Sequence, residues 1–284
     1  MHMPTCVSCG REMPPFSTGE VSNICPECRS AAMARAQAQP PVISRRSLVL
    51  ERMPVTSAII AVNVLVFIAM TFSGVSPGIP EVSQLIKWGA DFGPLTVTAQ
   101  PWRILTSNYV HIGIVHILLN MWCLWNLGAL AERLFDRWTY FLTYTACGLA
   151  GSLSSLWWHP MGVGAGASGA IFGMAGALIS ALYLGHLPVH PGALKSTLKS
   201  LGSFAGYNLF FGAVVPGIDN SAHLGGLISG LALGAVLARH LTSPPDERNS
   251  WRRWVFIVAG AVLLLVFHFV RRSVLHGLNG QTGT

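Results

Sequence analysis

The chain has 284 residues, of which 51% are hydrophobic and only 10% charged, and its mean hydropathy is +0.51. Soluble globular domains carry about 25% charged residues, so this composition argues against a soluble protein and favours one that lies in a lipid bilayer. The formal net charge of +7 comes from basic residues spread along the chain. Because they form no single patch, no nucleic-acid partner is expected.

Two pairs of cysteines lie near the start of the chain, Cys6 with Cys9 and Cys25 with Cys28, in the spacing C-x2-C-x15-C-x2-C. This spacing is typical of a tetrahedral zinc site. Four thiolates would close the coordination shell, so the zinc would be structural. Two disulfides are the alternative, which a cytoplasmic location disfavours. We therefore expect residues 1–30 to form a zinc-ribbon-like module, which could bind a protein partner.

The rest of the chain alternates between polar segments and long apolar stretches. Residues 31–52 are rich in Ala, Gln, Pro and Arg and should form a flexible linker. Crossing the hydrocarbon core takes about 20 mostly apolar residues. Seven stretches reach or approach that length: 54–73, 110–131, 138–158, 168–186, 200–217, 221–239 and 254–270. The sequence therefore predicts an all-α polytopic membrane protein with six spans in 53–242, a link and seventh span in 243–270, and a disordered tail over 271–284.

The distribution of Lys and Arg predicts how the chain crosses the bilayer, because basic residues gather on the cytoplasmic side. If the N-terminus is inside, all of the 18 basic residues fall in inside segments except Lys87, Arg103, Arg271 and Arg272. We therefore expect a multi-pass protein with a cytoplasmic N-terminus. The membrane is taken to be a bacterial plasma membrane.

A few strongly polar side chains interrupt the apolar stretches. Ser168 and His223 lie near the expected outer ends of the fourth and sixth spans, and His116 lies near that of the second, with Asn120 one turn deeper. Taken singly, such residues are more often packing or hydrogen-bonding groups. Four polar groups from three helices at one depth, however, predict a functional site in the outer half of the membrane.

Serine with histidine is the minimal nucleophile–base pair, in which the imidazole takes the hydroxyl proton as the oxygen attacks a carbonyl. We therefore predict Ser168 as nucleophile and His223 as base. Asn120 and His116 lie on one helix face and could donate to the oxyanion together with the Ser168 amide. Asp219, four residues before His223, either orients the imidazole or is a solvated loop charge.

Small residues repeat every four positions down the same two spans, at Gly169 and Gly173 in the fourth, and at Gly226 and Gly230 in the sixth. Such repeats let helix backbones approach closely. They are expected to bring the serine and the histidine within hydrogen-bond reach, although ordinary helix packing would use them as well.

Together these motifs resemble those of the rhomboid family of intramembrane serine proteases. Gly166–Gly169 is similar to the family's Gly-x-Ser-Gly nucleophile motif, and Ala222–Gly226, continuing to Gly230, is similar to its histidine helix. His116–Asn120 is similar to its His-x-x-x-Asn oxyanion motif, with His111 at an additional histidine position. The resemblance covers about 53–240 and implies a six-helix core with a seventh helix added.

Two further features belong to the resemblance. Trp102 and Arg103 are similar to the Trp-Arg pair that helps to fix the first outer loop. Phe172 stands where many members have a tyrosine that packs on the catalytic histidine. The resemblance implies hydrolysis of peptide bonds in or near the transmembrane helices of protein substrates, with no cofactor for catalysis.

Two other functions remain open from the residues alone. A catalytically silent membrane protein could capture substrate helices without cutting them, although it would have no need of Ser168, His223 and Asn120. A transporter is the weaker alternative, because the spans lack the carboxylates expected for ion coupling.

Overall fold

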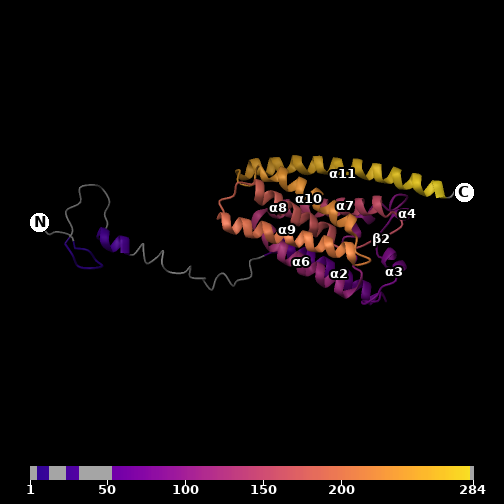
Figure 1. The fold of residues 1–284 in the computed structure, drawn as a ribbon, viewed down its shortest axis with the longest axis horizontal. Helices are drawn as coiled ribbons and strands as arrows, with labels where there is room; N and C mark the ends of the chain where they lie inside the picture. Colours follow the sequence, from indigo (N-terminus) through magenta and orange to yellow (C-terminus); the bar gives the residue numbers. More distant parts are fainter. Residues whose placement is uncertain (1–4, 13–23, 32–52, 282–284) are drawn as a thin grey trace. The chain divides into compact units, whose positions relative to one another are not determined.

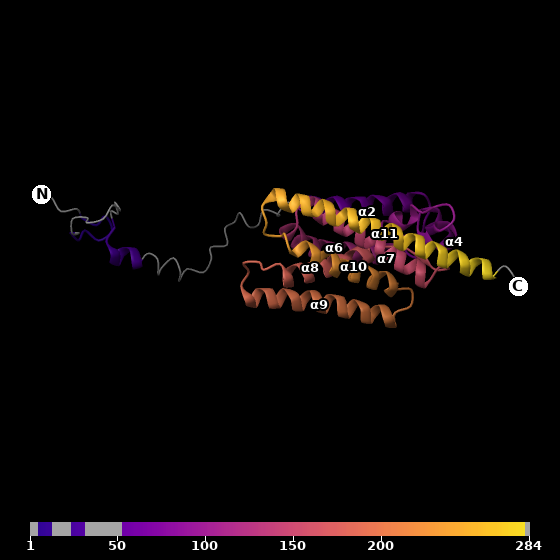
Figure 2. The ribbon, with the colours of Figure 1, turned by 90° about the horizontal axis from the view of Figure 1, so that it is seen from above.

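The computed structural model describes residues 5–12, 24–31 and 53–281. The chain divides into two compact units, Met1–Glu51 and Arg52–Thr284. The described part of the first unit contains an isolated antiparallel bridge and a short helix. The second unit is a bundle of helices that lie side by side, as Figure 1 and Figure 2 show.

Within 53–281 the bundle contains these helices of 17 residues or more: α2 (Pro54–Phe72), α6 (Gly113–Leu134), α7 (Arg137–Trp158), α8 (Ser168–Leu184), α9 (Pro191–Val214), α10 (Asn220–Ala238) and α11 (Pro245–Gln281). By length and composition, α2, α6, α10 and α11 can cross a membrane, and α8 is a shorter apolar helix. The helical membrane fold is therefore confirmed. The number of spans stays a prediction.

Local sequence explains where the helices begin. Pro54 and Pro191 stand in the first turns of α2 and α9, where a missing N–H costs nothing. Asp136 caps α7 by accepting from the backbone N–H groups of Trp138 and Thr139. Asp219 caps α10 in the same way.

The centre of the bundle is α8, which is buried from Gly169 to Leu178 and packs along α10. A Cβ on Gly226 would overlap the carbonyl oxygen of Gly169, and one on Gly230 would overlap that of Gly173. The two backbones thus touch, as the small-residue repeats predict. At the edges of the bundle, α11 runs along one side in Figure 1 and α9 forms the outer edge in Figure 2.

The segment between α2 and α6 folds into short elements: α3 (Val82–Lys87), β1 (Asp91–Phe92), α4 (Gly93–Thr96) and α5 (Arg103–Thr106). Strand β1 pairs antiparallel with β2 (Val163–Gly164), which precedes α8. Buried Arg103 donates from Nη1 to the carbonyls of Ile86 and Ala90, each at 2.7 Å. Its guanidinium also lies 4.9 Å from the ring centre of Trp102, so this pair links the short elements to one another.

The expectation for the end of the chain is wrong. A disordered tail was expected from residue 271, but α11 continues to Gln281, and it already begins at Pro245 within the expected link. Gly and Asn in this stretch suggest disorder, yet Val270 and Val274 are buried against Leu153 and Leu156, which extends the helix. Residues 282–284, and the expected linker 31–52 apart from residue 31, lie outside the described residues.

Candidate active site

Ser168 and His223, predicted from separate spans, lie next to each other. Ser168 is the first residue of α8, and His223 lies in the first turn of α10. The Oγ of Ser168 and the Nε2 of His223 are 2.9 Å apart, within hydrogen-bond distance. His223 is only 6% exposed, so water competes little for this hydrogen bond.

Phe172 holds the imidazole from one side. It lies one turn after Ser168 on α8, and its ring stacks on that of His223 with centroids 4.3 Å apart and planes 10° from parallel. The stacking that the resemblance implies for this position is present with a phenylalanine. The ring limits how far the imidazole can rotate.

His116 and Asn120 both extend from α6. The Nδ1 of His116 accepts from the backbone N–H of Ile112 at 3.2 Å, so the neutral ring carries its proton on Nε2. A Cβ on Gly166 would fall 2.9 Å from that Nε2, and so the Nε2–H lies beside the turn that leads to Ser168. Gly166 has φ +125°, a value suited to glycine.

Asn120 is 6% exposed, and its Nδ2 donates to the carbonyl of His116 at 2.9 Å. An amide nitrogen has two hydrogens, so one of them remains for a ligand. Its Oδ1 has no hydrogen-bond partner among the described residues. The Asn120 side chain is thus held by its own helix, and one Nδ2 hydrogen stays available for a ligand.

His111 has a different environment from His116. Its Nε2 accepts from the backbone N–H of Ala167 at 3.4 Å, and its Nδ1 lies 3.3 Å from the carbonyl oxygen of Tyr109. The ring is fully buried and 5.3 Å from that of His116. His111 therefore holds the turn before Ser168 through its hydrogen bond to the backbone of Ala167.

Asp219 is not a solvated loop charge, and its carboxylate interacts with His223 only electrostatically. Its carboxylate accepts from the hydroxyls of Ser155 and Ser221 and from the backbone N–H of Ala222, and no contact with His223 is among its hydrogen bonds. Burial would raise its pKa, but the hydrogen bonds from Ser155 and Ser221 hold the pKa of Asp219 below its usual value. The carboxylate thus caps α10 and ties it to α7.

Sequence reasoning missed Asn220. Its Oδ1 lies 3.3 Å from the Nδ1 of His223, the imidazole nitrogen that faces away from Ser168. The two residues are three apart on one helix, a spacing at which side chains meet. This three-residue spacing is the sequence feature from which a contact between Asn220 and His223 could have been predicted.

A polar cavity of about 30 Å³ adjoins Ser168, enough for one water molecule. Its polar lining comes from segments far apart in the sequence: Asp91, Ser107, Asn108, Ser152, Ser155 and Asp219. The Oδ2 of Asp91 is buried and has no hydrogen-bond partner among the described residues. A water in the cavity would satisfy it and would lie beside the serine.

The buried carboxyl of Asp91 predicts a pH-dependent stability. Burial raises its pKa from 3.8 to about 7. Between these two values the folded chain keeps a proton that the unfolded chain has lost, so stability should fall as the pH rises from about 4 to about 7. Asp91→Asn should remove this decrease, measured as melting temperature in detergent at about pH 5 and about pH 8. The exposed Asp246→Asn is the control, and a wild-type slope in Asp91→Asn would contradict the prediction.

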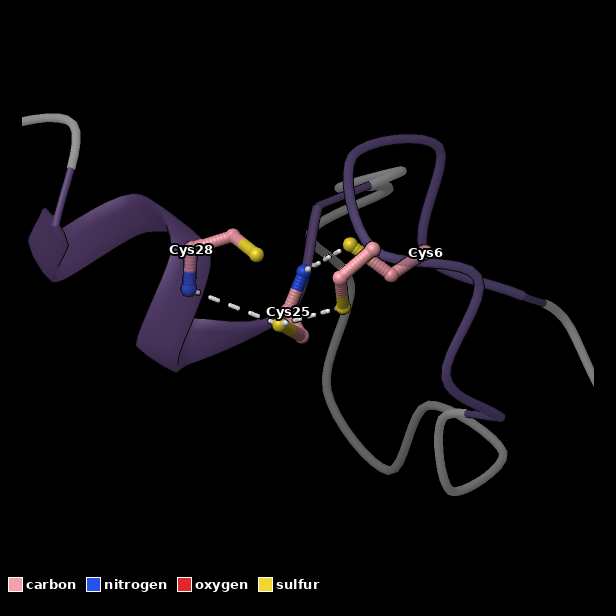
Figure 3. Close-up of side chains that lie close together, drawn as sticks. Cys6, Cys25 and Cys28 are labelled. Atoms are coloured by element: carbon pink, nitrogen blue, oxygen red, sulfur yellow. Dashed lines mark hydrogen bonds between the residues drawn. The ribbon is translucent and has the colours of Figure 1, made fainter.

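The four cysteines of the first unit come together in space. Figure 3 shows three of them, Cys6, Cys25 and Cys28, close to one another. Their sulfurs all lie within 4.8 Å of one another. The backbone N–H of Cys25 donates to the Sγ of Cys6 at 3.3 Å, and that of Cys28 to the Sγ of Cys25 at 3.4 Å. Zn–S bonds of about 2.3 Å in a tetrahedron need sulfurs about 3.8 Å apart. The Cys9 and Cys25 sulfurs are 3.8 Å apart, so the donor set fits zinc.

Comparisons with known proteins agree with the arrangement in the larger unit. The family model "Rhomboid domain" matches residues 98–240, half of the chain. The chain is 37% identical over 186 residues to "Rhomboid protease GluP" of Bacillus subtilis, covering 64% of this chain and 34% of that protein. It is 34% identical over 198 residues to "RHOMBOID-like protein 2" of Arabidopsis thaliana, covering 66% of this chain and 62% of the relative.

A third relative is matched over more of its length. The chain is 26% identical over 259 residues to "Rhomboid protease AarA" of Providencia stuartii, which covers 83% of this chain and 89% of that protein. By contrast, it spans about a third of the length of GluP and less than two thirds of the Arabidopsis protein. The matched domain contains Ser168, His223, His116 and Asn120. The chain is an integral membrane protein that belongs to the rhomboid family.

Proposed function

We propose that the chain is an intramembrane serine endopeptidase that cuts peptide bonds in or near the transmembrane helices of membrane-protein substrates. The observation that carries this proposal is the 2.9 Å hydrogen-bond distance between Ser168 Oγ and His223 Nε2, on two helices of an apolar bundle. A protein that only captures helices would not need this pair. Two relatives bear the printed name protease, which adds support.

The residues have the following roles in the proposed reaction. As Ser168 Oγ bonds to the scissile carbonyl carbon, its proton passes to His223 Nε2, and the negative charge moves to the carbonyl oxygen. His116 Nε2–H, the free hydrogen of Asn120 Nδ2 and the Ser168 amide are the proposed donors to that oxygen. His223 then gives its proton to the amide nitrogen, the C–N bond breaks, and the amine leaves.

The remaining ester between Ser168 and the substrate acyl group must react with water. The polar cavity beside Ser168 is the proposed source of that water, because it is large enough for one molecule and lined by hydroxyls and carboxyls. His223 takes a proton from the water as its oxygen attacks, and returns it to Ser168 Oγ when the ester bond breaks. The acid product then leaves.

The proposal is tested by incubating the purified chain in detergent with a transmembrane test substrate, beside the variant Ser168→Ala. Serine-dependent cleavage supports it. Cleavage that persists in the variant contradicts it, as does a wild-type protein that neither cleaves nor reacts with a fluorophosphonate. The fluorophosphonate needs no knowledge of the natural substrate, because it reacts with any activated serine.

The distribution of basic residues supports a cytoplasmic N-terminus. We propose a bacterial plasma membrane as the location, in keeping with the relatives from Bacillus subtilis and Providencia stuartii. The cysteine spacing and the distances between the four sulfurs support a structural Zn²⁺ at Cys6, Cys9, Cys25 and Cys28, in a module that could bind a protein partner.

Metal analysis of the purified chain tests the zinc proposal. One zinc per chain is expected, and Cys25→Ser should lose it, because three thiolates leave the coordination shell open. Cys123→Ser is the matched control, since that cysteine lies in α6. Equal zinc in all three proteins, or none in the wild type, would contradict the proposal.

A further inference from the structure

The imidazole of His223 has hydrogen-bonding neighbours at both nitrogens. Nε2 lies 2.9 Å from Ser168 Oγ, and Nδ1 lies 3.3 Å from Asn220 Oδ1. A neutral imidazole has one protonated nitrogen and one that accepts. For Nε2 to accept the serine proton, Nδ1 must carry the hydrogen and donate it. Asn220 Oδ1 accepts at that position.

The other end of the Asn220 side chain fixes which way its amide points. Nδ2 donates to the backbone carbonyl of Leu209 in α9 at 3.0 Å. If the amide turned over, oxygen would face the Leu209 carbonyl oxygen and nitrogen would face the Nδ1–H, so both hydrogen bonds would be lost. The α9 backbone therefore keeps the amide oxygen towards His223.

Helix α9 also passes very close to this amide. A Cβ on Gly212 would overlap Asn220 Oδ1, whereas one on Gly202 or Gly206, on the same helix, would meet no atom within 4 Å. The space at Gly212 is thus filled by the amide. The structure permits no side chain there without moving Asn220.

Asp219 does not take the place of Asn220 as a hydrogen-bond partner of the imidazole. It lies one residue earlier, but its two carboxylate oxygens already accept from Ser155, Ser221 and the backbone of Ala222. A neutral amide thus stands where the carboxylate of a Ser-His-Asp triad would stand, as in sites that use an asparagine.

We propose that Asn220 is a positioning residue for His223. It holds the imidazole in the tautomer that has its hydrogen on Nδ1, with Nε2 free to accept from Ser168, and α9 holds Asn220 through the Leu209 carbonyl and the space at Gly212. As a statement about catalysis this rests on the proposed protease function. The assignment of the tautomer of His223 does not depend on that function.

Four variants separate positioning from a merely structural role: Asn220→Ala, Asn220→Asp, Gly212→Ala and the control Gly206→Ala. Asn220→Ala should lower kcat about 10-fold to 100-fold with KM unchanged, since an imidazole in the wrong tautomer is a poor base. Asn220→Asp keeps the acceptor for Nδ1 but loses the donor to Leu209, so it should recover most of the rate. Gly212→Ala should resemble Asn220→Ala, and Gly206→Ala should resemble the wild type.

Two readouts are needed. Cleavage of the test substrate gives kcat and KM, and ¹⁵N NMR of histidine-labelled protein gives the tautomer of His223, identified by the signal that is missing in His223→Ala. The wild type should show a protonated Nδ1, and Asn220→Ala and Gly212→Ala should lose that signature while Gly206→Ala keeps it.

A wild-type kcat and tautomer in Asn220→Ala would overturn the inference, and so would an Asn220→Asp variant that is slower than Asn220→Ala. If the wild type cleaves nothing, the proposed function fails, and the tautomer spectra still decide whether Asn220 positions His223. Melting temperatures show whether each variant is folded.

Discussion

Ser168→Ala is expected to reduce kcat for a transmembrane test substrate by about three orders of magnitude or more. Without the hydroxyl no acyl-enzyme ester can form, and His223 has no proton to accept. Loss of the nucleophile in a serine protease costs about 10⁶-fold in kcat. The measurement is single-turnover cleavage by purified protein in detergent, with the amount of folded protein checked by melting temperature.

Ser200→Ala is the matched control for this experiment. Ser200 is an exposed residue of α9, and its hydroxyl donates to the carbonyl of Ser196 in its own helix at 3.0 Å. This variant should cleave at the wild-type rate. A comparable loss in both variants would point to damage by any serine replacement rather than to a nucleophile, and full activity in Ser168→Ala would contradict the assignment of Ser168 as nucleophile.

Asn120→Ala is expected to lower kcat by about 10²-fold to 10³-fold, equal to about 2.7–4 kcal/mol of transition-state stabilisation, with little change in KM. The expected cause is the loss of one donor to the oxyanion, whose negative charge develops in the transition state and is absent from the bound substrate. The side chain is buried and donates one hydrogen to the His116 carbonyl, so its second hydrogen is oriented before the substrate arrives. Steady-state kinetics on the same substrate measure the effect.

Asn126→Ala is the matched control, because the chain repeats the same local geometry six residues further along α6. Asn126 Nδ2 donates to the Trp122 carbonyl at 2.7 Å, four residues back, but its side chain is exposed. Loss of that helix contact alone should leave kcat unchanged. Equal losses in both variants, or a change confined to KM, would contradict the oxyanion role.

The helical membrane fold was predictable because long uncharged stretches have few alternatives to spanning a bilayer. The proximity of Ser168 and His223 was predictable for a different reason. Each lies in the first turn of a helix that carries a repeat of small residues. Where glycine backbones touch, as at Gly169 and Gly226, the starts of the two helices are brought together.

The neighbours of this pair were less predictable. Asn220 depends on a backbone carbonyl of α9, and backbone carbonyls carry no sequence signal. Asp91 and Ser155 line the cavity beside the serine only because β1 pairs with β2 and α7 packs on α10. Asp219 was misjudged because one of its partners, Ser155, lies on another helix, α7. Tertiary packing decides such contacts, and local patterns do not contain it.

The length of α11 has a consequence for how the chain meets water. With 37 residues and a rise of 1.5 Å per residue, the helix is about 55 Å long, whereas the hydrocarbon core is about 30 Å thick. No ordinary tilt absorbs a difference of about 25 Å. If α11 crosses the bilayer, several of its turns therefore project beyond the lipid tails. The C-terminal part of α11 carries Arg271, whose Nε donates to the Val97 carbonyl at 2.8 Å. This hydrogen bond attaches the end of α11 to the segment that leads to Arg103.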